Sequence, residues 1–194
     1  MALDPLYLFV FAGLFSPGPN VILLTASGAR FGFRRTLPHV AGVVVGVGIT
    51  SGLTALGIGA LLLELPWLAT TLRILAAGWI LWMAWTLVTA ARQPDGRAGH
   101  RPFTFVEAVL FQWVNPKVWA VALAAASGYA AGLGPWGEAL RLSTAFSGIN
   151  LFVCLFWSFA GSLLAWLLAS ERAWRIFMGG MALALAVSAG MVVL

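Results

Sequence analysis

The chain has 194 residues, of which 61% are hydrophobic and only 9% are charged, and its formal net charge is +5. A soluble domain carries roughly 25% charged residues, so this composition excludes a water-soluble globular protein. The basic residues lie in short breaks between apolar runs, which is a topology signal and excludes a nucleic-acid-binding surface. Because Cys154 is the single cysteine, thiol–disulfide electron transfer is also excluded.

Six charge-free stretches are long enough to cross a membrane, for which a helix needs about 20 mainly apolar residues. They cover residues 5–29, 36–63, 74–91, 118–137, 142–170 and 176–194. The third can begin earlier, near Pro66, and the length of the fifth indicates tilt or a break. No positively charged segment precedes the first stretch, which indicates a retained span and not a cleaved signal peptide. The sequence therefore predicts an all-α membrane protein with six transmembrane helices.

A polar linker at about 92–102 divides one transmembrane domain into a first repeat at about 1–91 and a second at about 103–194. With three spans in each half, the second half inserts upside down relative to the first. Residues 9–15 resemble residues 105–111, and residues 26–32 resemble residues 126–132. These matches favour two inverted-topology repeats of three helices.

Arginines in the connections predict the orientation of the chain. Eight of them lie on one side of the membrane, at positions 30, 34, 35, 92, 97, 101, 172 and 175. The opposite side holds at most Arg73 and Arg141. Connections rich in Lys and Arg stay in the cytoplasm, so both termini are predicted to face away from it.

The first span is interrupted by a break that consists of Ser16, Pro17, Gly18, Pro19 and Asn20. Prolines remove backbone donors and free carbonyl groups, which in a membrane need protein, water or ligand partners. Transporters place substrate sites at such discontinuous helices. The helix that resumes near Pro19 points its positive end at the break, which suits a carboxylate. A kink with a packing role is the alternative.

The fourth span contains a second break, with Gln112, Trp113, Asn115, Pro116 and Lys117. If this span starts near Phe105, Lys117 lies about 18 Å along it, near the middle of the bilayer. A charged residue there faces a cavity and indicates a functional site. If the span starts at Val118, Lys117 lies at the cytoplasmic surface. Hydropathy permits both placements, and the repeat alignment favours the deep one.

Three other features have two interpretations each. Asn150, in the fifth span, is either a site residue or an interhelical hydrogen-bonding group. The Gly-x-x-x-Gly patterns at 42–46 and 48–52 indicate close helix packing or dimer contacts. His39 is expected at the membrane interface, with a pH-sensing role as the alternative.

Several catalytic signatures are missing from the sequence. It has no His-Glu-x-x-His motif, no P-loop and no cluster of metal ligands. We therefore expect no enzyme activity, no cofactor and no metal, and we expect any transport to be driven by gradients and not by ATP.

The two breaks resemble the lysine-exporter (LysE/RhtB) family of bacterial inner-membrane transporters. Its Pro-Gly-Pro-Asn motif corresponds to residues 17–20, and its Asn-Pro-Lys motif to residues 115–117. The resemblance covers the whole chain and implies export of an amino acid or a small derivative from the cytoplasm, coupled to proton entry.

The residues narrow the expected substrate to a neutral amino acid, since the spans show no buried anion for a cationic one. Its carboxylate would meet Lys117 and the helix end near Asn20. Its ammonium group would use the carbonyls freed by the prolines, with Trp113 as a cation–π partner. Glu107, near the inner end of the fourth span, is the candidate coupling residue.

The predicted function is a secondary active exporter of a neutral amino acid or derivative that works by alternating access. A passive channel and a non-transporting membrane scaffold are the alternatives. The expected partners are the substrate, protons and membrane lipids. The glycine patterns and the resemblance also suggest a homodimer.

Overall fold

The computed structural model describes residues 4–58, 64–91, 101–168 and 170–193, and within them it is helical without strands. The helices are α1 (Pro5–Phe15), α2 (Pro19–Phe31), α3 (Phe33–Ala55), α5 (Pro66–Ala91), α6 (Phe105–Val114), α7 (Pro116–Gly128), α8 (Pro135–Leu167) and α9 (Glu171–Val193). The prediction of an all-α membrane protein is confirmed. Most of the predicted linker, at residues 92–100, lies outside the described residues.

The described helices form up to six membrane spans. Helices α3, α5, α8 and α9 are each long and apolar enough to cross a membrane. Helices α1 and α2 are bent by 59° at their break, and α6 and α7 by 64°, so each pair can form one broken span. Pro19 begins α2 and Pro116 begins α7. A proline fits the first turn of a helix because its missing N–H has no helical partner there.

The structure decides two features that hydropathy left open. The fourth span begins at Phe105 and not at Val118, which is the start that the repeat alignment favours. The fifth shows no break, since α8 is one continuous helix of 33 residues. The third span begins at Pro66, which is the earlier of its two expected starts.

Both broken spans begin at a side-chain cap. The carboxylate of Asp4 accepts a hydrogen bond from the backbone N–H of Leu6 at 3.0 Å, at the start of α1. At the start of α6, Thr104 and Glu107 form a capping box. Such caps satisfy backbone donors that a helix leaves free at its N-terminus.

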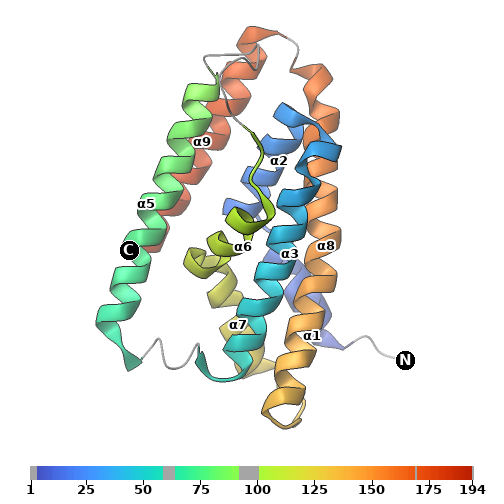
Figure 1. The fold of residues 1–194 in the computed structure, drawn as a ribbon, viewed down its shortest axis with the longest axis vertical. Coiled ribbons are helices and arrows are strands. Elements are labelled where there is room, and N and C mark those ends of the chain that lie inside the picture. The colour runs from blue at the N-terminus through green and yellow to red at the C-terminus, as the bar shows by residue number, and fades with distance from the viewer. Residues whose placement is uncertain (1–3, 59–63, 92–100, 169, 194) are drawn as a thin grey trace.

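Figure 1 shows α3 and α8 side by side, with α5 and α9 paired along another side of the molecule. Two buried apolar clusters hold these helices together. One centres on Val43 and Phe146 between α3 and α8, and the other on Ile80 and Met178 between α5 and α9.

Glycines allow the central helices to approach one another closely. A methyl group on Gly28 would collide with the Ser158 carbonyl, and one on Gly161 with the Thr25 carbonyl, so α2 and α8 pack backbone to backbone. The glycines at 42 and 46 face α6, and those at 48 and 52 face α8. The Gly-x-x-x-Gly patterns therefore serve packing within the chain.

The two halves have the same order of elements, a broken span followed by two continuous helices. In Figure 1, α1 and α2 lead toward the top of the molecule, whereas α6 and α7 lead toward the bottom. Their contacts also correspond. Helix α8 packs against α1 and α2, and its counterpart α3 packs against α6 and α7.

Candidate functional site

The breaks of the two bent spans meet at Lys117. Its Nζ atom donates hydrogen bonds to the carbonyl oxygens of Ser16 and, at 3.2 Å, of Pro17. These two carbonyls belong to the first break and to neither of its helices. The aliphatic part of Lys117 crosses Gly18, where a methyl group would lie 2.7 Å from Cδ. Glycine at this position is therefore needed for the close approach of the lysine.

A second connection between the breaks is a partly buried network of amide side chains. Asn20 Nδ2 donates to Gln112 Oε1 at 2.9 Å, and Gln112 Nε2 donates to Asn20 Oδ1 at 3.2 Å. Gln112 Nε2 also donates to the Ala108 carbonyl at 3.0 Å, and Asn115 Nδ2 donates to Gln112 Oε1 at 3.3 Å. The network fixes the first turn of α2 against the end of α6.

A cavity of about 20 Å³ lies beside these contacts. It is lined by Leu14, Gly18, Asn20, Val21, Leu24, Asn115, Lys117, Val118, Asn150, Val153 and Cys154. This volume holds about one water molecule, so a larger ligand fits only if the lining residues move.

Two polar atoms of the cavity walls have no hydrogen-bond partner among the described residues, namely Asn115 Oδ1 and Asn150 Nδ2. The two side chains are 1% and 2% exposed. Unpaired buried polar atoms are rare because desolvation costs about 1–3 kcal/mol for each. One acceptor and one donor without partners in the described chain thus belong to residues that line the cavity.

The cavity carries an uncompensated positive charge. Lys117 lines it, and none of the lining residues is acidic. The N-termini of α2 and α7, at Pro19 and Pro116, lie at the breaks and add partial positive charge. The described site therefore has the electrostatic character to bind an anionic group such as a carboxylate.

The structure brings together most of the residues predicted for the site. Lining the cavity or bonded to its walls are Ser16, Pro17, Gly18, Asn20, Gln112, Asn115, Lys117 and Asn150. Pro19 and Pro116 begin the two helices beside it. Three further lining residues, Leu24, Val153 and Cys154, carry no sequence signal, since they look like any other apolar residues of a membrane span.

Two predicted residues do not reach the cavity. Trp113 is 41% exposed, and its ring lies 6.3 Å from that of Trp119. Glu107 lies at the start of α6, where it accepts hydrogen bonds from Arg101 at 2.6 and 2.8 Å. His39, expected at the interface, is buried in α3 with its ring 5.1 Å from that of Phe103.

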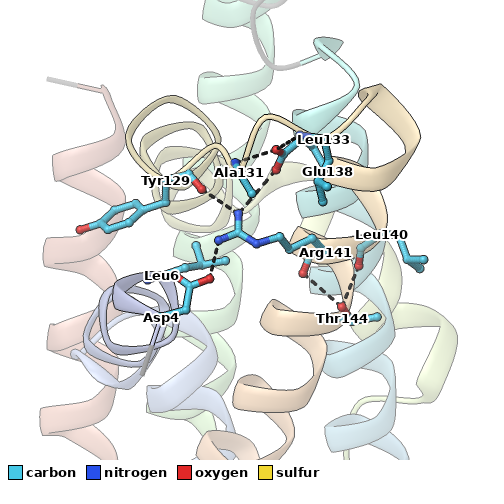
Figure 2. A network of polar contacts seen from close by, with 9 residues as sticks. All are labelled: Asp4, Leu6, Tyr129, Ala131, Leu133, Glu138, Leu140, Arg141 and Thr144. Atoms are coloured by element: carbon cyan, nitrogen blue, oxygen red, sulfur yellow. Dashed lines mark hydrogen bonds and ion pairs between the residues drawn. The ribbon is translucent and has the colours of Figure 1, made fainter. Parts of the chain in front are cut away.

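A separate polar network surrounds Arg141 at the start of α8 (Figure 2). Its guanidinium forms an ion pair with Asp4 at 2.5 Å and donates to the Tyr129 carbonyl at 2.7 Å. Glu138 lies 3.5 Å from the same guanidinium and accepts from the backbone N–H groups of Ala131 and Leu133 at 2.7 and 3.0 Å. The hydrogen bond from Arg141 lowers the pKa of Asp4 below its ordinary value. The network joins the start of α1, the end of α7 and the following loop to α8.

Comparison with known proteins places these features in a family. The LysE type translocator family matches residues 11–194. Over 153 residues the chain is 31% identical to the cysteine/O-acetylserine efflux proteins of Escherichia coli (strain K12) and Shigella flexneri, an alignment that covers 76% of each chain. No solved structure matches the chain. The match spans both breaks and the residues that line the cavity between them, which confirms the resemblance seen in the two motifs. The chain therefore belongs to the LysE type translocator family, and it is a multi-pass membrane transporter and not an enzyme.

Proposed function

We propose that this chain is a secondary active exporter that moves a neutral amino acid or a small derivative out of the cytoplasm across the bacterial inner membrane. The observation that carries the proposal is Lys117, a cation between two broken spans in a cavity without an acidic lining residue. The two relatives are named for the efflux of cysteine and O-acetylserine. Both compounds have a carboxylate, an ammonium group and a small uncharged side chain.

The substrate's carboxylate binds Lys117 in this proposal. The Nζ atom donates to the carbonyls of Ser16 and Pro17, and an ammonium group has three donors, so its third N–H can donate to a carboxylate. A cationic substrate such as lysine would place a second positive charge beside Lys117 with no acidic lining residue to offset it. This like-charge repulsion favours a neutral amino acid.

Alternating access between two inverted repeats is the proposed mechanism. The matching order, opposite direction and corresponding contacts of the two halves support an inverted repeat, and such repeats move around a central site. The Arg141 network joins α1, α7 and α8 at the end of the molecule where α1 begins. At the other end, the Arg101–Glu107 pair spans only six residues of one segment and joins no second helix. We assign the Arg141 end to the outside, because the arginine-rich connections lie at the other end.

Protons are the proposed coupling ions, with Glu107 as the coupling residue. Its carboxylate accepts from both Arg101 and the backbone N–H of Thr104. Protonation would remove the negative charge that both donors use, so it would loosen the start of α6, which leads into the second break. A homodimer remains part of the proposal, but it requires a surface other than the glycine patterns, which face α6 and α8.

Efflux from proteoliposomes tests the proposed function. Vesicles with purified protein are loaded with labelled alanine, serine, cysteine, O-acetylserine or lysine, and efflux is followed with and without a pH gradient. We expect saturable, gradient-stimulated efflux of the neutral compounds, with counterflow, and much weaker efflux of lysine. Flux without saturation or counterflow would indicate a channel, and no flux of any compound would favour a scaffold.

The variant Lys117→Met tests the site itself, since it keeps the length of the side chain and removes its charge. We expect it to reduce efflux at least about tenfold, as the loss of a charged hydrogen bond does. Arg175→Met is the matched control, because Arg175 is an exposed cation in α9 paired with Glu171 at 3.4 Å. Normal efflux by Lys117→Met would remove the lysine from the mechanism.

A further inference from the structure

One wall of the cavity comes from a single face of α8. Asn150 and Cys154 are four residues apart on this helix and both line the cavity. Residues at this spacing lie one helical turn apart on the same face. Both are almost completely buried, with 2% and 1% of their surfaces exposed. The wall thus presents a polar group and, one turn further on, a small sulfur-containing one.

The polar part of this wall lacks a hydrogen-bond partner within the part of the chain that the structure describes. Asn150 Nδ2 has no hydrogen-bond acceptor among the described residues, although it lies in a membrane span. The cavity that it lines also contains Lys117, a second donor, and Asn115, whose Oδ1 is a free acceptor. Two donors and one acceptor around one cavity match the carboxylate and ammonium groups of an amino acid.

The remaining part of the cavity is apolar. Beyond Asn150 its lining includes Leu24, Val153 and Cys154. A substrate whose carboxylate is held by Lys117 and Asn150 must place its side chain against these residues. Cysteine leaves more room than leucine or phenylalanine would, but neighbouring Val153 and Leu24 limit that room.

We propose that Asn150 positions the substrate's carboxylate together with Lys117, and that Cys154 sets the upper size of the substrate's side chain. The inference rests on the proposed function, since it takes the cavity as the transport site. It narrows the substrate class to amino acids with small, uncharged side chains.

Competition by unlabelled amino acids of increasing size tests this inference. Efflux of labelled alanine from the proteoliposomes is measured with glycine, serine, valine or leucine as competitor. One methylene group in an apolar pocket changes discrimination by about 10- to 200-fold. Wild-type protein should therefore need at least about tenfold more leucine than glycine for the same competition.

The Cys154 variants should move this size limit in opposite directions. Cys154→Leu should lose competition by valine while glycine still competes, and Cys154→Ala, which cannot overpack the core, should admit valine and leucine better. Cys154→Ser keeps the size and should behave as wild type. Gly148→Leu is the matched control, because it adds the same side chain to α8 where no atom lies within 4 Å. Unchanged size preference in both Cys154→Leu and Cys154→Ala would overturn the inference.

Replacing Asn150 should weaken competition by every amino acid to the same extent. Asn150→Leu should raise the required concentration of every amino acid by about the same factor, at least tenfold, because it removes a contact to the shared carboxylate. An unchanged requirement would overturn the role of Asn150. If Lys117→Met abolishes efflux while the Asn150 and Cys154 variants behave as wild type, the proposed function stands and this inference fails.

A second measurement does not depend on transport. Cys154 is the only cysteine of the chain, so N-ethylmaleimide modification of the purified protein reports this residue alone. We expect alanine to slow the modification in wild-type protein, and leucine to do so at least tenfold less effectively. Equal modification rates with and without alanine, including a thiol that stays unreactive in both, would count against the position of Cys154 at the substrate.

Discussion

Replacing Gly18 by alanine should impair transport while leaving the protein folded. The new methyl group would lie 2.7 Å from Cδ and 3.0 Å from Nζ of Lys117, well inside the 3.5–4.0 Å of an ordinary contact. The backbone of Gly18 is extended, with φ at 176°, a conformation that alanine adopts without strain. Because the colliding atoms form the end of a flexible side chain, Lys117 moves and the helices stay in place.

The expected loss follows from the contacts that Lys117 would give up. Displacement of Nζ weakens its hydrogen bonds to the carbonyls of Ser16 and Pro17 and misplaces the charge for the substrate. A hydrogen bond to a charged group contributes about 1.5–3 kcal/mol, which corresponds to about 10- to 150-fold in transport efficiency.

Efflux kinetics and thermal unfolding in detergent measure the two parts of this prediction. The control is Gly148→Ala, whose methyl group meets no atom within 4 Å. Efflux by Gly18→Ala equal to that of the wild type would refute the importance of the lysine's exact position. A thermal midpoint lowered by many degrees would refute the view that only a side chain gives way.

Three further predictions concern stability, measured by thermal unfolding in detergent. Gly28→Ala should destabilise the fold by about 1–3 kcal/mol or more, because its methyl group meets the backbone of α8, and an unchanged midpoint would contradict this close packing. Asn20→Ala and Gln112→Ala should each lower the free energy of unfolding by about 1–3 kcal/mol, because each leaves its partner unpaired. The double variant should lower it by less than the sum of the two single effects. Strict additivity would argue against the Asn20–Gln112 hydrogen bonds. The lowered pKa of Asp4, caused mainly by Arg141, means that its carboxylate stabilises the fold above the ordinary pKa of 3.8. That contribution to stability should disappear as the pH falls through the lower pKa that Asp4 has in the folded state. Asp4→Asn should lack this pH dependence. Parallel plots of unfolding midpoint against pH for wild type and Asp4→Asn would contradict the prediction.

The membrane fold and its breaks could be predicted from the sequence because both depend on local chemistry. A run of about 20 apolar residues forms a helix wherever lipid surrounds it. A proline such as Pro19 or Pro116 removes a backbone donor regardless of its neighbours. Hydropathy left the start of the fourth span open between Phe105 and Val118, because Glu107 and Lys117 interrupt its apolar run, and the repeat alignment favoured the start at Phe105 that the structure has.

The site could be predicted only in part. The motifs marked Lys117 and Asn20 as functional, but their composition did not show which groups each would contact. Trp113 has the chemistry of a cation–π partner, yet the helical turn on which it lies directs it outward. Cys154 carries no sequence signal, since a lone cysteine in an apolar run resembles any core residue.

The tertiary structure alone decided which distant groups meet. Lys117 reaches carbonyls about a hundred residues away, and Arg141 pairs with Asp4 across 137 positions of the chain. Such contacts depend on how closely the helices pack, which is set here by glycines such as Gly28 against the backbone of α8. Periodicity and hydropathy describe each helix alone, whereas the cavity exists only where two broken helices and α8 come together.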